Sequence, residues 1–266
     1  MYALDFEYDG IRLSDYGMMI CKFDSGGLET VSSGSDLTFN TVKTTGSDIF
    51  RFYGAKYEES YSATFQVCKN RCDSENIKLN PLEVSGIQRW LCRKDGFHKF
   101  KIIQDDYVDI YWNATFAVKQ LDLGGEIIGL ELTLHTDSPY AYGSEQSATF
   151  SINESGSTFS LYDQNDEIGY IYPTLEITNS GVGTLTLYSD LSPKKTTIVF
   201  ESQDTVTLNG VNKTIVSEND YDLSGKFNFI FPKLINTFDN RENLFTASGV
   251  TCDITFFYCP KIKVGL

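Results

Sequence analysis

Histidine, serine and cysteine side chains are the first candidates for chemistry in this chain, and they form no catalytic pattern. A nucleophilic site needs a histidine near a serine or cysteine, with a carboxylate to orient it. The chain has only two histidines. His98 lies between Phe97 and Lys99 at the start of an expected strand, and His135 ends another. No Gly-x-Ser-x-Gly elbow occurs, so both histidines are predicted to be structural.

Paired carboxylates are the second candidate, because glycoside hydrolysis uses two that face each other across a cleft. The adjacent pairs Glu58-Glu59 and Asp105-Asp106 do not supply this, since neighbours on a strand point to opposite faces. Carboxylates from distant segments could still converge, so a glycan hydrolase stays open as an alternative. The acidic stretch 239–243 lacks the register of a calcium loop and is predicted to be a solvated turn.

The cysteines do not predict a metal centre. Six of them are scattered along the chain: Cys21, Cys68, Cys72, Cys92, Cys252 and Cys259. The Cys68-x3-Cys72 spacing lacks the two-residue gap and the second ligand pair of a typical zinc site. Glycine loops that cradle phosphate are also absent. The sequence therefore predicts no catalytic, cofactor-binding or metal-binding residue and no cofactor, and reduced, buried thiols.

The charge is strongly negative, with 36 acidic against 22 basic residues and a net charge of −14. This balance disfavours sequence-independent binding to nucleic acid and attraction to anionic membranes. It fits plain solubility, and it also fits a wall that repels DNA in a channel. No stretch approaches the roughly 18 apolar residues of a membrane span. Residues 1–8 do not resemble a secretory signal, so folding in a cytosol is expected.

The elements that would position any site are mostly strands. Asp9-Gly10 predicts a tight hairpin turn between strands at residues 4–8 and 11–14, and residues 18–23 make a further strand. Residues 25–48 are rich in Ser, Gly and Thr and alternate only weakly over 37–42. They predict a long exposed hairpin or arm that would order best against a neighbour.

One helix interrupts the strands of the first half, over about residues 81–95. Asn80 is a good N-cap, Pro81 suits the first turn, and Glu83 completes a capping box. Its apolar stripe is expected to be Leu82, Ile87, Trp90 and Leu91, and Gly96 is expected to end it. The flanking strands are predicted at residues 57–67, 97–103, 108–118 and 128–134. Residues 1–140 thus read as an α+β domain, a strongly twisted antiparallel sheet or open barrel with one packed helix.

A break at residues 138–145 separates this part from a second domain, residues 146–266, in which no helix is expected. Strands are predicted at 148–152, 158–162, 174–178, 185–188, 196–201, 205–208, 213–216, 226–231 and 250–258. Many short strands with frequent turn signals indicate a β-sandwich. The chain as a whole is predicted to be mainly β.

Several motifs in this order resemble the distal tail protein (Dit) family of long-tailed bacteriophages. The run Ile87-Gln-Arg-Trp-Leu91 is similar to the family's helical "RWL" element. The segment 130–142, which ends in Ser-Pro-Tyr-Ala-Tyr, is similar to the strand and exit that close the family's first domain. Residues 172–178, Phe229-Ile-Phe-Pro232 and the last strand followed by Pro260-Lys261 resemble landmarks of the second domain.

The resemblance implies a split-barrel first domain and a galectin-like β-sandwich second domain. It also implies a virion tail component, assembled in the host cytoplasm, whose first domain forms a homo-hexameric ring between the tail tube protein and the tail-tip hub or tail-associated lysin. DNA would pass through the ring without specific binding, past acidic side chains in the bore, and no membrane would be involved. In some relatives the outer domain carries receptor-binding or carbohydrate-binding elements, but a galectin-like fold does not itself imply sugar binding.

Three other hypotheses remain open. The sandwich would serve a carbohydrate-binding module or a receptor-binding accessory protein if Tyr170, Tyr172 and Tyr188 stack on sugars. The chain would be an enzyme if distant carboxylates converge. It would be a different ring component, such as a tube protein, although such subunits are usually single domains. The resemblance and the absent chemistry favour a non-enzymatic structural protein.

Overall fold

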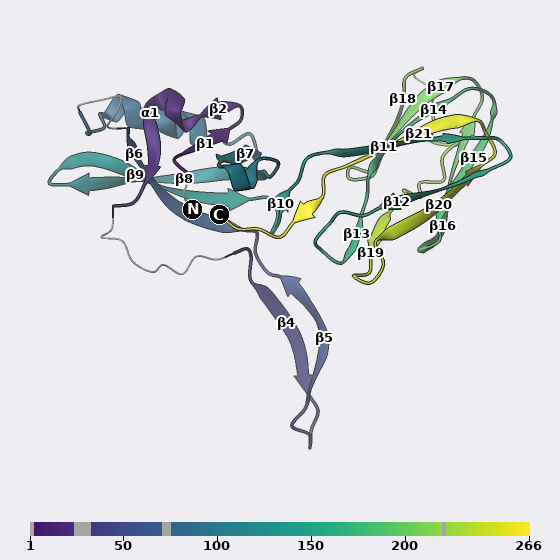
Figure 1. The fold of residues 1–266 in the computed structure, drawn as a ribbon, viewed down its shortest axis with the longest axis horizontal. Coiled ribbons are helices and arrows are strands. Elements are labelled where there is room, and N and C mark those ends of the chain that lie inside the picture. Colours follow the sequence, from purple (N-terminus) through teal and green to yellow (C-terminus); the bar gives the residue numbers. More distant parts are fainter. Residues whose placement is uncertain (1–2, 24–32, 71–75, 220–221) are drawn as a thin grey trace. The chain divides into compact units, whose positions relative to one another are not determined.

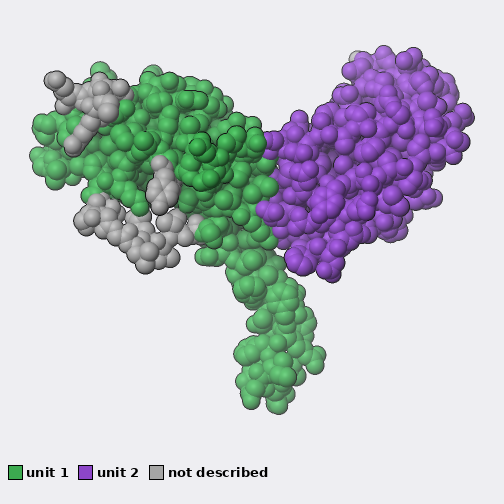
Figure 2. Space-filling model, in the orientation of Figure 1, with its two compact units in different colours: residues 1–143, 262–266 green, residues 144–261 purple. Residues whose placement is uncertain are grey.

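Two compact units make up the chain (Figure 2). The computed structural model describes residues 3–23, 33–70, 76–219 and 222–266. Unit 1 comprises Met1–Gly143 together with Ile262–Leu266, and unit 2 comprises Ser144–Lys261. Each unit buries its own hydrophobic core. Strands dominate both units, which confirms the predicted mainly β fold class.

A seven-stranded antiparallel sheet forms the body of unit 1, in the order β2-β1-β7-β8-β9-β6-β3 (Figure 1). Its strands are β1 (Asp5–Tyr8), β2 (Ile11–Arg12), β3 (Met18–Cys21), β6 (Ser62–Lys69), β7 (His98–Ile103), β8 (Trp112–Leu123) and β9 (Glu126–Thr136). The predicted turn at Asp9-Gly10 joins β1 to β2, with φ of 52° and 77°. Side chains alternate across the sheet, so that Leu130, Leu132 and Leu134 of β9 are fully buried.

Helix α1 (Pro81–Leu91) is the only α-helix among the described residues, and it begins where the sequence predicts. Asn80 Oδ1 accepts hydrogen bonds from the backbone N–H groups of Leu82 (3.0 Å) and Glu83 (2.9 Å). Glu83 Oε2 in turn accepts one from the Asn80 N–H at 2.8 Å. The capping box thus satisfies donors that the first helical turn leaves unpaired. No helix in the described ranges has the length and hydropathy needed to span a bilayer.

The helix ends earlier than the predicted residue 95. Its last residue is Leu91, because Cys92 leaves helical geometry at φ −92° and ψ 64°. Arg93 does not continue the last turn and pairs instead with Asp9 at 2.5 Å and Asp95 at 2.6 Å. Charge-assisted hydrogen bonds to two carboxylates are stronger than the interaction of this guanidinium with the helix C-terminus.

The buried face of the helix also differs from the predicted stripe. Leu82 is 84% exposed and takes no part in the core, whereas Val84 is buried beside Ile87 and Leu91. Trp90 makes the main contact with the sheet. Its ring stacks on that of Phe6 from β1, with the ring centroids 5.7 Å apart, so the helix is held against the sheet by aromatic packing.

Two predicted strands of unit 1 begin later in the chain than expected. The segment 57–67 is not one strand, because residues 58–60 are exposed and separate it into the end of one strand and the start of β6. The segment 108–118 becomes a strand only at Trp112, and Val108 is 69% exposed. Residues 13–16 form the short 3-10 helix η1 (Leu13–Tyr16), and residues 105–107 form η2 (Asp105–Tyr107), where turn or strand was expected.

A separate hairpin leaves the body of unit 1 (Figure 1). It consists of β4 (Leu37–Lys43) and β5 (Phe50–Tyr57), which pair only with each other among the described strands. The predicted exposed arm at 25–48 therefore contains β4 and the turn. The second strand was not predicted, and residues 24–32 of the predicted arm lie outside the described part of the chain.

Unit 2 is a sandwich of a five-stranded and a four-stranded antiparallel sheet, in the orders β11-β21-β14-β17-β18 and β12-β20-β15-β16. The first sheet contains β11 (Gln146–Ile152), β14 (Thr174–Asn179), β17 (Asp204–Asn209), β18 (Thr214–Ser217) and β21 (Cys252–Tyr258). The second contains β12 (Ser157–Tyr162), β15 (Gly183–Ser189), β16 (Ser192–Phe200) and β20 (Glu242–Ser248). The predicted β-sandwich is thereby confirmed.

Short pairs complete the fold: β13 (Gly169–Ile171) with β19 (Leu234–Asn236), and β10 (Ala141–Tyr142) with β22 (Lys261–Ile262). The predicted strand at 226–231 is wrong, since this segment makes only an isolated bridge, Ile198 to Phe227. Strand β20 was not predicted. Residues 262–266, which the sequence assigned to the second domain, pack with unit 1.

Candidate assembly surface

The residues that could do nucleophilic chemistry serve the fold of unit 1. His98 Nε2 lies 2.9 Å from Asp95 Oδ1, and Asp95 also pairs with Arg93. Arg93, and after it His98, hold the pKa of the Asp95 carboxyl well below its usual range. The His98 ring packs edge-on against Tyr8 at 5.7 Å. This network ties the end of α1 to the start of β7, and His135 stands apart from it, exposed on β9.

The described thiols differ in burial: Cys252 is buried, Cys21, Cys68 and Cys259 are partly buried, and Cys92 is exposed, so the prediction of buried thiols is correct only for Cys252. Burial raises the pKa of Cys21, which lies beside Cys68, and raises that of Cys252 to about 12. Neutral, buried thiols are poor nucleophiles and poor metal ligands. Cys72 lies outside the described residues, and in the remainder no three His, Cys, Asp or Glu side chains gather as a metal site would require.

The adjacent carboxylate pairs singled out in the sequence, Glu58-Glu59 and Asp105-Asp106, are exposed. Glu58 and Glu59 lie between β5 and β6. In the stretch 239–243, Glu242 starts β20 and Asn243 is fully buried. The Asn243 side chain accepts a hydrogen bond from the Ile235 N–H at 2.8 Å and donates one to the Ile235 carbonyl oxygen at 3.0 Å. Residues 242–243 therefore belong to the sandwich, whereas residues 239–240 are exposed and outside any strand, in keeping with the predicted solvated turn.

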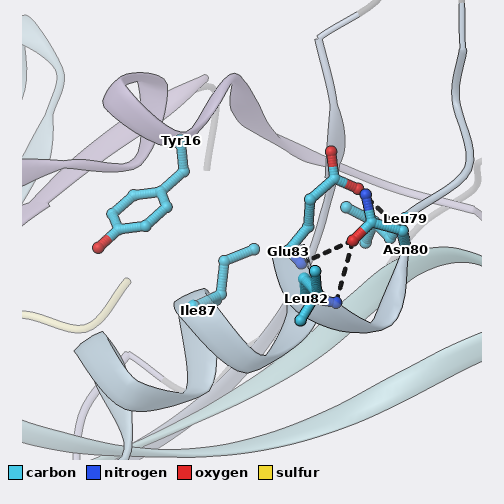
Figure 3. A pocket seen from close by; sticks show the side chains of 7 residues that line it. Tyr16, Leu79, Asn80, Leu82, Glu83 and Ile87 are labelled. Atoms are coloured by element: carbon cyan, nitrogen blue, oxygen red, sulfur yellow. Dashed lines mark hydrogen bonds between the residues drawn. The ribbon is translucent and has the colours of Figure 1, made fainter.

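A pocket of about 370 Å³ lies at the start of α1 (Figure 3). Tyr16, Leu82 and Ile87 line it together with the capping residues Asn80 and Glu83. Figure 3 shows the cap bonds that occupy Asn80 and the first amide groups of the helix. Lys69 also pairs with Glu83 at 2.8 Å. Because these polar groups already bond one another, the pocket offers no free set for a ligand.

The β4–β5 hairpin carries the largest set of exposed aromatic side chains in unit 1. Strand register puts Thr41 opposite Phe52 and Lys43 opposite Phe50. Between the pairs Phe39–Ala55 and Thr41–Phe52, β5 has one residue more than β4, which makes a β-bulge. One face of the hairpin thus presents Leu37, Phe39, Phe50, Phe52 and Tyr57, which we call the apolar face. Phe39, Phe50 and Phe52 are 63%, 62% and 64% exposed. The rings of Phe39 and Phe52 lie 6.3 Å apart, as residues on one face should.

The opposite face of the hairpin is mainly polar. It carries Thr38, Asn40 and Lys56, and the cross-strand pair Val42 and Arg51, while Tyr53, which follows Phe52 at the bulge, is 66% exposed. A two-stranded hairpin alone is marginally stable in water, and exposed apolar patches of this kind mark interaction sites. Its outer strand edges are also unpaired in the described structure, so they are free to extend a neighbouring sheet. The arrangement is suited to assembly and has no feature of catalysis.

Comparison with known families agrees with this. Residues 1–138 match a family model described as phage tail protein N-terminal domain, and residues 140–258 match one described as phage tail C-terminal domain. The chain belongs to this phage tail protein family. The tail protein is accordingly a structural component of the virion tail. No curated protein sequence matches it.

The tail protein also shares its fold with a solved structure. This is the crystal structure of SPP1 Dit (gp 19.1), titled a paradigm of hub adsorption apparatus in Gram-positive infecting phages. The TM-score is 0.64 at 12% sequence identity, and the match covers 96% of this chain and 98% of that one. The predicted resemblance to the distal tail protein family is thereby confirmed at the level of the fold. Sequence reasoning located the arm by its composition but missed Phe50–Tyr57, whose alternating Phe50 and Phe52 were the available signal.

Proposed function

We propose that this tail protein forms a hexameric ring that joins the tail tube to the tail tip or baseplate and lets DNA pass. The observation that carries the proposal is the apolar face of the β4–β5 hairpin. Three phenylalanines exposed by more than half their surface would be buried if each hairpin packed against the next copy. In a closed ring every copy offers the hairpin and receives one, so no apolar face stays in water.

The two units would have different roles. Unit 1, with the hairpin, forms the ring and contacts the tail tube protein. Unit 1 also contacts the tail-tip hub or tail-associated lysin, and unit 2 contacts a receptor-binding protein or a host glycan. Assembly takes place in the bacterial host cytoplasm, and the protein makes and breaks no covalent bond. The confinement of the exposed hairpin to unit 1 supports this division.

DNA would pass through the ring without specific binding. The net charge of −14 supports this part of the proposal, because a surface of the same sign as the phosphates repels the duplex and keeps it mobile. Acidic side chains are expected to line the bore. A bore lined by neutral or basic residues in the assembled particle would refute this part.

The ring is tested by light scattering and negative-stain imaging of the purified protein, alone and with tail tube and hub proteins. We expect particles of six copies with six-fold symmetry. Replacing two residues of the apolar face, Phe39→Ser with Phe52→Ser, should convert the ring to monomers. Since both side chains are exposed in the monomer, the thermal unfolding midpoint should change little.

Val42→Ser is the matched control. Val42 is 56% exposed on the opposite face of the same hairpin, so this change removes a similar side chain without touching the apolar face. The control should assemble as the unchanged protein does. Monomers alone under all conditions, or a double variant that still forms rings, would refute the proposal.

A further inference from the structure

Unit 2 contains a cavity whose lining is cationic and aromatic. Its volume is about 300 Å³, the lower end of the range for small-ligand sites. The side chains that define it are Lys194, Lys213, Lys233, Tyr172, Phe229 and Phe231. They come from β16, from the segment after β13, from the loop before β18 and from the segment before β19. We call this the lysine pocket.

The lysines of this pocket have no carboxylate partner. No acidic residue lines it, and among the described residues Lys194, Lys213 and Lys233 form no ion pair. Other lysines of this acidic chain do, as Lys119 pairs with Glu131 at 3.2 Å and Lys226 with Glu201 at 2.6 Å. Three uncompensated ammonium groups around one cavity of a chain with net charge −14 are an arrangement for an anion.

The ammonium groups also disfavour one another. Burial, and after it the charge of Lys233, lowers the pKa of Lys213. A bound anion would offset the repulsion between the ammonium groups and favour their charged form. In the absence of an anion, neighbouring aromatic rings hold Lys213 and Lys233 in place. Lys213 Nζ lies 2.7 Å from the centroid of the Tyr172 ring, and Lys233 Nζ lies 4.0 Å from that of Tyr170.

The backbone around the pocket is held in unfavourable conformations. Four non-glycine residues have positive φ in the described part of the chain, and two of them are Lys213 (58°) and Phe229 (56°). Such a φ is rare for a bulky residue and clusters at binding sites. It projects the Phe229 ring toward solvent, where 56% of it is exposed.

Two local features maintain this geometry. The Asn228 side chain accepts hydrogen bonds from the Thr197 N–H (3.1 Å) and the Ile230 N–H (3.2 Å), and donates one to the Lys195 carbonyl at 2.7 Å. Gly210 lets the loop before β18 approach Tyr172, because a Cβ there would lie 2.8 Å from the Tyr172 Cβ. The pocket is therefore shaped by its surroundings before any ligand arrives.

We propose that the lysine pocket binds an anionic saccharide, that is, a sugar unit bearing a phosphate or carboxylate group. The three ammonium groups would hold the anion, and the exposed Phe229 ring would pack against the apolar face of the sugar ring. Aromatic faces suit the C–H face of a sugar, whereas an anion alone would not need them. A cavity of about 300 Å³ takes one or two sugar units, which is too small for an extended acidic peptide of several side chains.

The test is calorimetric titration of the whole protein with glucose 1-phosphate, glucuronic acid, glucose and a poly-glutamate peptide at low and moderate salt. At least one of the two anionic sugars should bind, at least about tenfold more tightly than glucose, and its affinity should fall as salt rises. The phosphate and carboxylate arms identify which anion the pocket prefers. Binding of poly-glutamate as tight as that of the sugars would overturn the proposal in favour of a protein-docking site.

Three variants locate the binding. Lys213→Gln with Lys233→Gln should weaken the anionic sugar at least about tenfold, whereas Lys226→Gln, an ion-paired lysine of the same unit, should not. Phe229→Gly should weaken it severalfold without lowering the unfolding midpoint, because glycine accepts the positive φ. No binding by any anionic sugar, or full affinity in the double lysine variant, would refute the proposal. The ring proposal is judged by light scattering and stands or falls separately.

Discussion

Single backbone positions decide how closely the strands of unit 2 can approach. Gly249 lies between β20 and β21 at φ 99°, and a Cβ there would overlap the Thr184 carbonyl oxygen. Gly181 lies nearby in the connection between β14 and β15, yet a Cβ on it would meet nothing within 4 Å. Gly249 is therefore required at its position, whereas Gly181 can be replaced.

We expect Gly249→Ala to lower the free energy of unfolding of unit 2 by about 1–3 kcal/mol, the cost of holding a side chain at such a φ, with the overlap adding to it. Gly181→Ala should change it by no more than about 0.5 kcal/mol. Urea unfolding followed by far-ultraviolet circular dichroism measures both. Equal midpoints for the two variants would show that the close approach at Gly249 is not required.

Asp163 gives unit 2 a pH dependence of a definite sign. The residue is 1% exposed, and its pKa is raised, chiefly by burial, although hydrogen bonds from Asn165 and the charges of Arg241 and Lys261 lower it in part. A carboxyl whose folded pKa exceeds its unfolded pKa holds its proton more tightly in the folded state. Stability therefore falls as pH rises from the unfolded to the folded pKa, and the cost of the buried charge is complete above it.

Asp163→Asn should consequently raise the unfolding midpoint at pH 7, because the amide oxygen can still accept from Asn165 without a buried charge. The gain should shrink as pH falls through the raised folded pKa of Asp163, because the unchanged carboxyl is then protonated. Thermal unfolding of both proteins at several pH values measures the difference. A gain that does not vary with pH would contradict the assignment.

At the scale of elements, periodicity predicted the strands whose inward residues are large and apolar. Strands β9 and β21 are examples, with Leu132 and Phe256 fully buried. Strand β20 escaped prediction because its inward positions are Asn243, Phe245 and Ala247, of which only one is large and apolar. Burial of Asn243 depends on partners from β19, and no local pattern reveals that.

The candidate sites were predictable to different degrees. The exposed arm followed from its composition, since Ser, Gly and Thr signal a segment without a core. The apolar face of the arm could not be predicted from the sequence, because the register between β4 and β5 contains a bulge. The lysine pocket combines residues from four separate segments. Tyr172 was a candidate for stacking, but nothing in its sequence neighbourhood places Lys213 and Lys233 beside it.

The helix of unit 1 supplies a prediction about its two faces. Ile87 is 1% exposed against the sheet, whereas Leu82 is 84% exposed on the same helix. Ile87→Ala should cost about 2–5 kcal/mol, the usual price of a large-to-small change in a core, and Leu82→Ala less than about 0.5 kcal/mol. Unfolding monitored by tryptophan fluorescence reports both. A large effect of Leu82→Ala on the isolated subunit would show instead that Leu82 belongs to the packed face of the helix, as the sequence predicted.

At the scale of the whole molecule, unit 2 is inserted into unit 1. The chain leaves unit 1 after Gly143 and returns at Ile262. The returning segment packs on the core of unit 1 through Ile262, Val264 and Leu266. The Leu266 N–H donates a hydrogen bond to the Tyr61 hydroxyl at 2.7 Å, and the Tyr107 hydroxyl donates one to the Gly265 carbonyl at 2.9 Å.

The two tryptophans of the chain, Trp90 and Trp112, both belong to unit 1, so their fluorescence follows the unfolding of that unit alone. Deleting residues 262–266 removes the two hydrogen bonds, worth about 1 kcal/mol each, and exposes apolar surface beneath them. The fluorescence midpoint should therefore fall by the equivalent of about 2 kcal/mol or more, while the amides of unit 2 keep their protection from hydrogen exchange. If the deletion left the fluorescence midpoint unaltered, the returning segment would have no part in the stability of unit 1, and residues 1–143 would fold without it.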